Sequence, residues 1–236
     1  MILNKELIQS IEYLKKMKNL TLIIPAKKEA ESLPQVLQEI KNVGCKIIVI
    51  LESSDIETIE SIKDFDRKIV YQSNKGYGDA LIQGINNVQT DYLCIYNADG
   101  SFDPKYLNNM LSLCKNQDFV FASRYLKEAG SEDDTIITKV GNIFFTTLGN
   151  LLFSLKLSDI LFTYVLGKTK SFKLLNLKSK DFRLCVEIPI SAKRMNFSYV
   201  DIPSYERKRI AGKKKVNEFR DGFKILFYMI KRFLRL

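Results

Sequence analysis

The fold of this chain is decided by the stretch Tyr92-Leu93-Cys94-Ile95-Tyr96-Asn97-Ala98-Asp99-Gly100-Ser101-Phe102-Asp103-Pro104. It begins with the mostly apolar residues of a buried β-strand and changes abruptly to short polar side chains, a glycine and a proline. Asn97 and Asp99 can both offer an oxygen to a hard divalent cation such as Mg²⁺ or Mn²⁺, which commonly completes its shell with substrate phosphates. The same residues are also ordinary in turns. The rest of the chain has to distinguish a metal site from a turn.

The composition bounds the class of protein and removes several kinds of chemistry. A chain of 236 residues with 46% hydrophobic content fits one large α/β domain, or a domain with a small appendage. It has no histidine, which excludes Ser-His-Asp and Cys-His catalysis and histidine metal sites. The four cysteines lie far apart in apolar surroundings and predict neither disulfides nor a zinc site. Residues 1–19 alternate charged and apolar residues, unlike a signal peptide, so we expect a cytoplasmic protein.

The positive charge is concentrated at the end of the chain. Residues 205–236 carry 11 lysines and arginines against 3 acids, whereas residues 1–204 carry 26 against 24. Such a basic block points to an anionic partner, either a membrane surface or a nucleic acid.

Strand and helix patterns alternate through the first half of the chain. We expect buried strands at 20–25, 46–51, 68–72 and 119–123, in addition to the strand that begins at Tyr92. Helical spacing of apolar residues predicts helices at 4–18, 31–43 and 105–114, with shorter helices ending near 62 and 88. This alternation predicts an α/β fold with a doubly wound, mostly parallel sheet. Ligands of such sheets bind beyond the carboxyl ends of the strands.

Polar loops follow these strands at the edge where a ligand is expected. A glycine pair at a strand-to-helix junction lets the backbone approach a phosphate or a base, although it can also simply turn the chain. The acids in these loops are either ligand-binding groups or solvated side chains. The loops contain, in chain order, Pro25, Ala26 and Glu29 after the first strand, Glu52 after the second, and Asn74, Gly76 and Gly78 after the third.

The second half of the chain is less regular. Residues 143–155 are apolar, but Lys156 and Asp159 interrupt before a length that could cross a bilayer, which leaves a core helix or an interfacial one. Residues 157–172 stay apolar without a clear period. Residues 183–190 form a buried strand or helix that contains Glu187, either a site acid or an ion-pair partner of a nearby arginine. A further strand is expected at 197–203.

The basic end of the chain predicts a loop at 206–215 and an amphipathic helix at 216–236. Aromatic and aliphatic residues share one arc of this helix, and basic residues line an adjoining stripe, as in helices that lie flat on an anionic membrane. We therefore expect a main domain over 1–204, with an apolar membrane-side segment at about 136–172, and an appendage over 205–236. The arc contains Phe219, Phe223, Phe227, Ile230, Phe233 and Leu234, and the stripe contains Arg220, Lys224, Lys231 and Arg235.

Several short motifs occur together in a specific order, from about residue 20 to 230. They are Ile23-Ile24-Pro25-Ala26 with Glu29, Ile47-Ile48-Val49 with Glu52, Asn74-x-Gly76-x-Gly78-x-Ala80, Asn97-Ala98-Asp99-Gly100, Ser123-Arg124-Tyr125, Leu157-Ser158-Asp159, Glu187, Ile202-Pro203-Ser204-Tyr205, Arg209-x-x-Gly212-x-x-Lys215-Val216 and Arg220-Asp221-Gly222. In this order they resemble glycosyltransferase family 2, which has the GT-A fold. The resemblance is greatest to its polyprenyl-phosphate glycosyltransferase branch, which includes dolichyl-phosphate mannose synthase.

The resemblance implies an inverting transfer of a hexose from a nucleotide diphosphate sugar to a polyprenyl phosphate or lipid-linked glycan at the inner face of the membrane, in cell envelope glycan synthesis. It implies Mg²⁺ or Mn²⁺ as the cofactor and no nucleic acid partner. The implied metal ligands are Asp99 and Asn97; the implied catalytic residues are Asp99, Glu187 and Arg209. The implied donor site contains Pro25, Ala26, Glu29, Glu52, Asn74, Gly76, Gly78, Asn97, Ala98 and Asp99, and the implied acceptor phosphate site contains Arg124, Arg207, Arg209, Lys213 and Lys215.

The sequence also departs from the pattern of that family. Leu51-Glu52 stands where two aspartates are usual, Asn97 replaces the first aspartate of the metal motif, and Thr163-Tyr164-Val165 differs from the acceptor-side motif. A degenerate, non-catalytic member is therefore one alternative. A sugar nucleotidyltransferase on a similar sheet is another, but it would need a glycine-rich phosphate loop after the first strand, where residues 25–29 contain no glycine. A nucleic-acid-binding protein is disfavoured by the apolar arc of the last helix.

Overall fold

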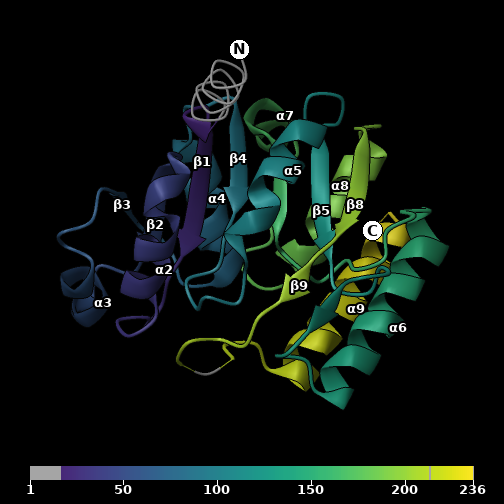
Figure 1. The fold of residues 1–236 in the computed structure, drawn as a ribbon. Coiled ribbons are helices and arrows are strands. Elements are labelled where there is room, and N and C mark those ends of the chain that lie inside the picture. The colour runs from purple at the N-terminus through teal and green to yellow at the C-terminus, as the bar shows by residue number, and fades with distance from the viewer. Residues whose placement is uncertain (1–16, 213, 236) are drawn as a thin grey trace, which may run out of the picture.

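The computed structural model describes residues 17–212 and 214–235 (Figure 1). The helix expected over residues 4–18 lies almost wholly outside this part of the chain. The predicted α/β class is confirmed: a seven-stranded, mostly parallel sheet lies between helices.

The strands of the central sheet follow the order β3-β2-β1-β4-β7-β5-β8. Neighbouring strands run parallel, except that β7 is antiparallel to both β4 and β5. Strands β1, β4 and β5 consist almost entirely of buried residues because helices cover both faces. The bounds are β1 Leu20–Pro25, β2 Lys46–Leu51, β3 Lys68–Tyr71, β4 Tyr92–Ile95, β5 Phe119–Ser123, β7 Val165–Lys168 and β8 Tyr199–Pro203.

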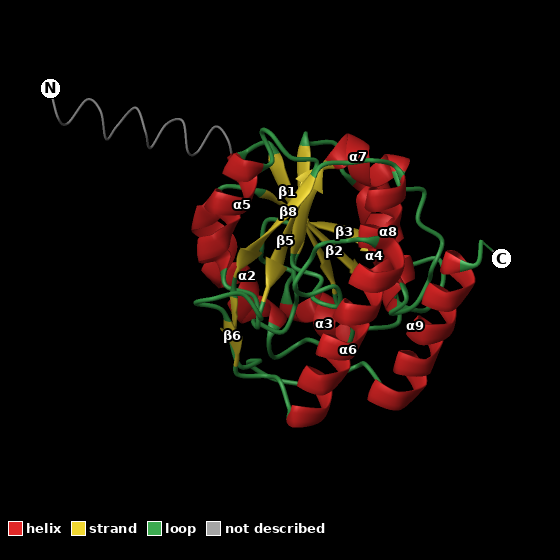
Figure 2. Ribbon diagram, turned by 90° about the vertical axis from the view of Figure 1, so that its right-hand side faces the viewer, coloured by secondary structure: helices red, strands yellow, loops and turns green. Residues whose placement is uncertain are grey.

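Two helical layers pack on the sheet (Figure 2). Alternate residues of β1 show the division: Leu22 and Ile24 pack with α2 and α5, whereas Ile23 packs with α4 and α8 on the other face. The helices are α2 Leu33–Ile40, α3 Ile56–Ser61, α4 Tyr77–Asn87, α5 Leu107–Leu113, α7 Thr169–Leu174 and α8 Leu184–Arg194, with 3-10 turns η1 Lys41–Val43 and η2 Pro104–Tyr106.

Strand β7 was not predicted, and residues 183–190, left open as strand or helix, belong to helix α8. A second, two-stranded sheet was also not predicted. It pairs β6 Gly130–Ser131 with β9 Tyr205–Glu206 in parallel, and so holds the start of the basic loop against the segment that precedes α6.

Helices α6 Ile136–Phe153 and α9 Glu218–Phe233 pack side by side beyond the main sheet (Figures 1 and 2). A capping box between Thr135 and Thr138 starts α6 seven residues before the expected apolar run. The helix is therefore longer than the expected run of 143–155. By length and composition α6 is long and apolar enough to cross a bilayer, and only 17% of it is buried.

The outer faces of α6 and α9 are apolar and exposed. On α6, Ile136 is 84% exposed and Leu151 is 77% exposed; on α9, Phe219 is 71% exposed and Phe227 is 70% exposed. The inner faces bury Phe145, Ile225 and Met229 against α8 and the sheet, so the pair is fixed to the domain. Further exposed apolar residues are Ile137, Val140, Ile143 and Phe144 on α6, Phe223, Ile230 and Phe233 on α9, and Leu234 just after its end.

Candidate active site

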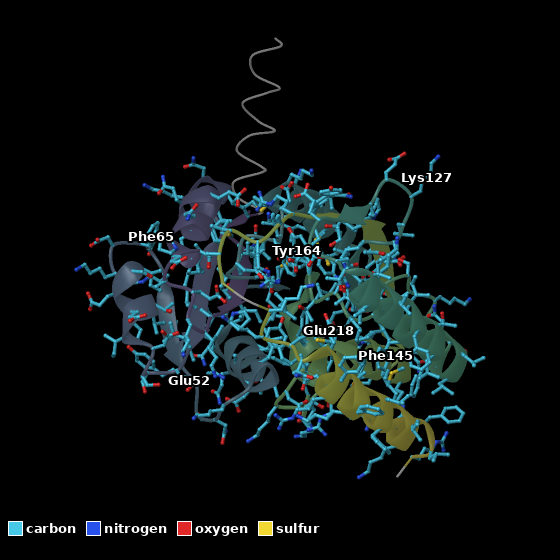
Figure 3. All side chains as sticks on the ribbon, turned by 90° about the horizontal axis from the view of Figure 1, so that it is seen from below. Glu52, Phe65, Lys127, Phe145, Tyr164 and Glu218 are labelled. Atoms are coloured by element: carbon cyan, nitrogen blue, oxygen red, sulfur yellow. The ribbon has the colours of Figure 1, made fainter. Side chains whose placement is uncertain are left out.

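One cavity of about 890 Å³ opens at the carboxyl edge of the sheet. Figure 3 views the molecule from this side, with Glu52 on one flank and Phe145 and Glu218 on the other. The cavity is bounded by the loops after β1, β2 and β4, by the basic loop, and by helices α6 and α9. Of the predicted site residues, it is lined by Pro25, Ala26, Glu29, Glu52, Gly76, Asn97, Ala98, Asp99, Arg124, Arg209 and Lys215.

Asp99 lies in a tight turn directly after β4. Its Oδ1 accepts the Ser101 backbone N–H at 3.0 Å, so Oδ2 is the carboxylate oxygen left outside the turn. Gly100 has φ of +81°, the left-handed conformation that favours glycine. The Asn97 amide nitrogen donates to Ser101 Oγ at 3.3 Å, which leaves the Asn97 amide oxygen as an acceptor.

The oxygens of Asp99 and Asn97 fit a hard divalent cation if the cation takes its other ligands from elsewhere. The two residues supply one carboxylate and one amide oxygen, and the described residues contain no group of three or more acidic, cysteine or histidine side chains placed to hold a metal ion. Mg²⁺ commonly uses one or two carboxylates and takes further oxygens from water and substrate phosphates. Asp99 and Asn97 therefore fit a cation that arrives with a diphosphate.

Two acids form the flank of the cavity near β1 and β2. Glu29 is nine-tenths buried; it accepts the Ser32 hydroxyl at 2.8 Å, and Lys215 Nζ lies 3.4 Å from its Oε1. Glu52 forms an ion pair with Lys27 at 3.0 Å. Both predicted acids thus lie at the cavity, each beside a lysine.

The two glycines of the predicted donor loop pack against another loop of the protein. A Cβ atom on Gly76 would lie 2.1 Å from the Lys180 carbonyl oxygen, and one on Gly78 would lie 2.2 Å from that of Ser179. Gly78 lies outside the cavity lining, and so does Asn74, whose amide nitrogen donates to Asp79 at 3.1 Å. Loop packing therefore requires these glycines whether or not a ligand is bound.

Glu187 lies away from the cavity, and its predicted place beside the metal ligands was wrong. Helix α8 buries it, and its two carboxylate oxygens accept the backbone N–H groups of Lys178 and Ser179 at 3.0 and 2.8 Å. Glu187 thus holds the loop that packs on Gly76 and Gly78. Its predicted alternative, an ion pair with Arg183 or Arg194, is also absent among the described residues, where Arg183 pairs with Asp181.

Arg124 reaches the cavity wall, but carboxylates occupy its N–H groups. Its Nε and Nη2 donate to Asp159 at 2.7 and 3.1 Å, and its Nη1 donates to Glu206 at 3.2 Å and to Asp134 at 3.4 Å. Burial alone would lower the pKa of Arg124, but its neighbours, chiefly the carboxylates of Asp159 and Glu206, together outweigh burial and raise that pKa. Arg124 therefore joins the end of β5 to α6 and β9, in place of the predicted phosphate contact.

Residues 207–212 and 214–217, here called the strap, cross the metal-motif turn. The Arg207 N–H donates to the Ser101 carbonyl at 2.9 Å, and the Ile210 N–H donates to the Asp99 carbonyl at 2.8 Å. The Ile210 side chain covers Gly100, where an added Cβ would lie 2.4 Å from Ile210 Cδ1. Backbone and side chain thus fix the strap to the turn that carries Asp99.

The predicted basic residues of the strap take different positions. Arg207 lies outside the cavity lining, because it forms an ion pair with Glu39 at 2.6 Å. Arg209 and Lys215 face the cavity, and Lys213 lies outside the described residues. Lys214, which was not predicted, also lines the cavity. It could have been predicted from the sequence, because it stands between the two predicted residues Lys213 and Lys215.

The wall opposite Glu52 is largely apolar, with Thr138, Asn142, Glu218 and Asp221 as its polar members. It is formed by one face of α6 and the first turns of α9, so the cavity extends from the polar turn of Asp99 to the exposed helix pair. The sequence predicted an apolar segment and an amphipathic helix but did not place them in the same cavity. This wall contains Ile137, Val140, Phe144 and Phe145 of α6 and Phe219 and Ile225 of α9.

The sheet order and the acid-bearing turn beside one large cavity define a GT-A type glycosyltransferase fold. Residues 21–175 match the model of the family Glycosyl transferase family 2, and the chain belongs to this family. It is thus a glycosyltransferase. An uncharacterized protein of Methanocaldococcus jannaschii is 23% identical over 222 residues, covering 89% of this chain and 90% of that protein. An uncharacterized glycosyltransferase of Mycobacterium tuberculosis is 30% identical over 105 residues, only 44% of this chain and 48% of that relative.

Solved structures share the fold at low sequence identity. Glucosyl-3-phosphoglycerate synthase from Mycobacterium tuberculosis, in complex with Mn²⁺, UDP and glucosyl-3-phosphoglycerate, matches with a TM-score of 0.72 and 12% identity, over 94% of this chain and 83% of that one. Mannosyl-3-phosphoglycerate synthase from Rubrobacter xylanophilus matches with a TM-score of 0.70 and 14% identity, over 95% and 77%. At this identity the match establishes the GT-A fold.

Proposed function

We propose that this protein transfers a hexose, with inversion, from a nucleotide diphosphate sugar to a lipid phosphate at the inner face of a membrane. One observation carries the proposal: a single cavity joins the polar turn of Asp99 to an apolar wall made by α6 and α9. A lipid phosphate is an acceptor with a charged end and an apolar end. The cavity likewise has a charged end at Asp99 and an apolar end at α6 and α9.

The donor would occupy the polar end. Asp99 and Asn97 would hold Mg²⁺ or Mn²⁺, which when bound neutralises the charge of the departing diphosphate. The glucosyl-3-phosphoglycerate synthase structures with UDP and Mn²⁺ or Mg²⁺ support this assignment. Glu29 and Glu52, which line the flank where β1 and β2 end, would accept hydrogen bonds from the ribose and the base.

The acceptor would need little help from a general base. A phosphate monoester is ionised near pH 7, so one of its oxygens attacks the anomeric carbon while the bond to the nucleotide diphosphate breaks. Arg209, Lys214 and Lys215 line the cavity and would bind phosphate oxygens as charge-assisted donors. No proton has to leave the acceptor in this reaction.

The helix pair would lie on the membrane. Its exposed apolar side chains would enter the interface, and basic residues of α9 such as Lys231 would face anionic headgroups. The acceptor lipid would then reach the cavity between α6 and the start of α9 without leaving the interface.

The competing acceptor is a small soluble phosphate such as 3-phosphoglycerate, by analogy with the structural neighbours. Purified protein is incubated with nucleotide sugars, Mn²⁺ and either polyprenyl phosphate in anionic vesicles or 3-phosphoglycerate, and products are identified by mass spectrometry. We expect transfer to the lipid only, and at least about a tenfold loss in Val140→Asp, which puts a charge on the apolar wall. Ile56→Asp is the control, because Ile56 is 60% exposed on α3 and lies outside the cavity lining. Transfer to 3-phosphoglycerate alone would overturn the proposal.

A further inference from the structure

Arg209 lies between two carboxylates of the cavity. Its Nε and Nη2 donate to Asp133 Oδ1 and Oδ2 at 3.2 and 2.7 Å, and its Nη1 lies 3.5 Å from Asp99 Oδ2. The three side chains are between 14% and 20% exposed, so water screens them only in part. One guanidinium therefore neutralises part of the charge of both acids.

The contact with Asp99 involves the carboxylate oxygen that matters for a cation. Oδ1 of Asp99 is used by the Ser101 N–H within the turn, whereas Oδ2 faces Arg209. Two positive groups at the same oxygen repel each other. A divalent cation at Asp99 and the guanidinium in this position cannot both interact with Oδ2 at full strength.

We propose that Arg209 competes with the divalent cation for Asp99, and that Asp133 is a positioning residue that limits this competition by holding the guanidinium. The inference rests on the metal site of the proposed function. Occupation of Asp99 by a cation would free Nη1 of Arg209 for a phosphate oxygen, while Nε and Nη2 stay on Asp133. Cation binding at Asp99 and phosphate binding by Arg209 would thus favour each other.

The geometry around Asp133 suits this role. The side-on pairing through Nε and Nη2 fixes the plane of the guanidinium and leaves Nη1 directed at Asp99. The strap cannot easily withdraw Arg209, because the next residue, Ile210, is bound to the Asp99 carbonyl. Lys214 Nζ donates to the Asp133 carbonyl at 2.7 Å and lies 3.5 Å from its Oδ2, so Asp133 has a second cation and does not depend on Arg209 alone.

The test is the affinity for Mn²⁺ alone, measured by electron paramagnetic resonance on the full chain without any nucleotide. We expect Arg209→Gln to bind Mn²⁺ roughly three- to tenfold more tightly than wild type, since it removes the competitor. The matched control is Lys214→Gln. It also removes one positive charge from the cavity, but Lys214 contacts Asp133 and not Asp99, so we expect less than a twofold change in Mn²⁺ affinity. Asp133→Asn should weaken Mn²⁺ binding, because the guanidinium then depends on Asp99 alone. The double variant should bind like Arg209→Gln.

Each outcome has a definite meaning. Equal Mn²⁺ affinity in wild type and Arg209→Gln, or equal gains in Arg209→Gln and Lys214→Gln, would overturn the competition while leaving the metal site intact. Tight binding that survives Asp99→Ala would overturn the metal site itself and the inference with it. Where no variant binds Mn²⁺ alone, the titrations are repeated with inorganic pyrophosphate present, and absence of binding there too would overturn the metal site. Thermal unfolding of each variant identifies any that fails to fold, and Arg209→Met, which also removes the charge but keeps an unbranched apolar stem, then replaces Arg209→Gln.

Discussion

The carboxylate of Glu187 accepts the backbone N–H of Ser179 at 2.8 Å, and this contact holds the loop on which Gly78 packs. Replacing Glu187 by Gln keeps the size but removes the charge, and puts an amide group against a backbone N–H. We expect a loss of about 2 kcal/mol in the free energy of unfolding and weaker nucleotide binding, both measured on purified protein. Glu60→Gln is the control, because Glu60 is an exposed surface acid. An altered Mn²⁺ requirement at unchanged stability would restore Glu187 to the metal site.

Asp99→Ala should lower turnover at least about 100-fold, since the loss of a cation ligand removes several kcal/mol of charge stabilisation. The fold should survive with a cost of about 1 kcal/mol, because the losses are the hydrogen bond to the Ser101 N–H and the 3.5 Å contact with Arg209 Nη1, which keeps its partner Asp133. Steady-state kinetics and denaturant unfolding measure the two effects. Asp103→Ala, four residues along and paired with the exposed Lys105, should keep its turnover within about twofold. Similar losses in both variants would point to damage to the turn instead of a lost ligand.

Gly78→Ala should destabilise the protein by about 2 kcal/mol or more, because its Cβ would meet the Ser179 carbonyl at 2.2 Å and the Asp181 carbonyl at 2.8 Å, both parts of the backbone. Gly141→Ala is the matched control. A Cβ there has no atom within 4 Å, and alanine favours the helix, so α6 should gain about 0.5–1 kcal/mol. Urea denaturation compares the two variants. A neutral Gly78→Ala would show that the loop around residue 180 can move aside.

Phe223→Ser with Phe227→Ser should weaken binding to vesicles with anionic lipid at least about tenfold, because both side chains lie on the exposed apolar face of α9. The free energy of unfolding should stay the same. Tyr71→Ser is the control, since Tyr71 is 53% exposed on β3. Sedimentation with vesicles measures the binding. Unchanged binding in the double variant would argue against the helix pair as the membrane contact.

The pH dependence of stability should contain a contribution from Asp118. Partial burial alone would raise its pKa, but hydrogen bonds from Ser198, Ser171 and Lys168 outweigh burial and hold the pKa of Asp118 below its usual value. A carboxyl whose pKa is lower in the folded state stabilises at neutral pH, and this stability is lost as the pH falls through its folded pKa. Asp118→Asn should therefore cost about 1 kcal/mol at pH 7 and less towards pH 3. Denaturation curves at both values check the trend; a constant difference would contradict it.

The sequence predicted the parallel half of the sheet well, because buried strands and amphipathic helices leave clear patterns there. It could not predict β7, since the mostly apolar residues 157–172 carry no period that reveals a strand. The turn of Asp99 was found from short polar residues after a strand. The contacts of the strap could not be predicted, because the residues that it meets are distant along the chain: Arg207 and Glu39 are 168 positions apart. Glu187 was misplaced for a related reason, since only the path of α8 decides which loop its carboxylate meets.

The strap is bound to the metal-motif turn through main-chain groups, from Arg207 N–H to Ser101 and from Ile210 N–H to Asp99. Main-chain hydrogen bonds do not depend on which side chains the strap carries. Its outward-facing residues can therefore be exchanged during evolution or in the laboratory without shifting the turn beneath them. A library that varies residues 214 and 215, which line the cavity, would explore new acceptors while Asp99 stays in place.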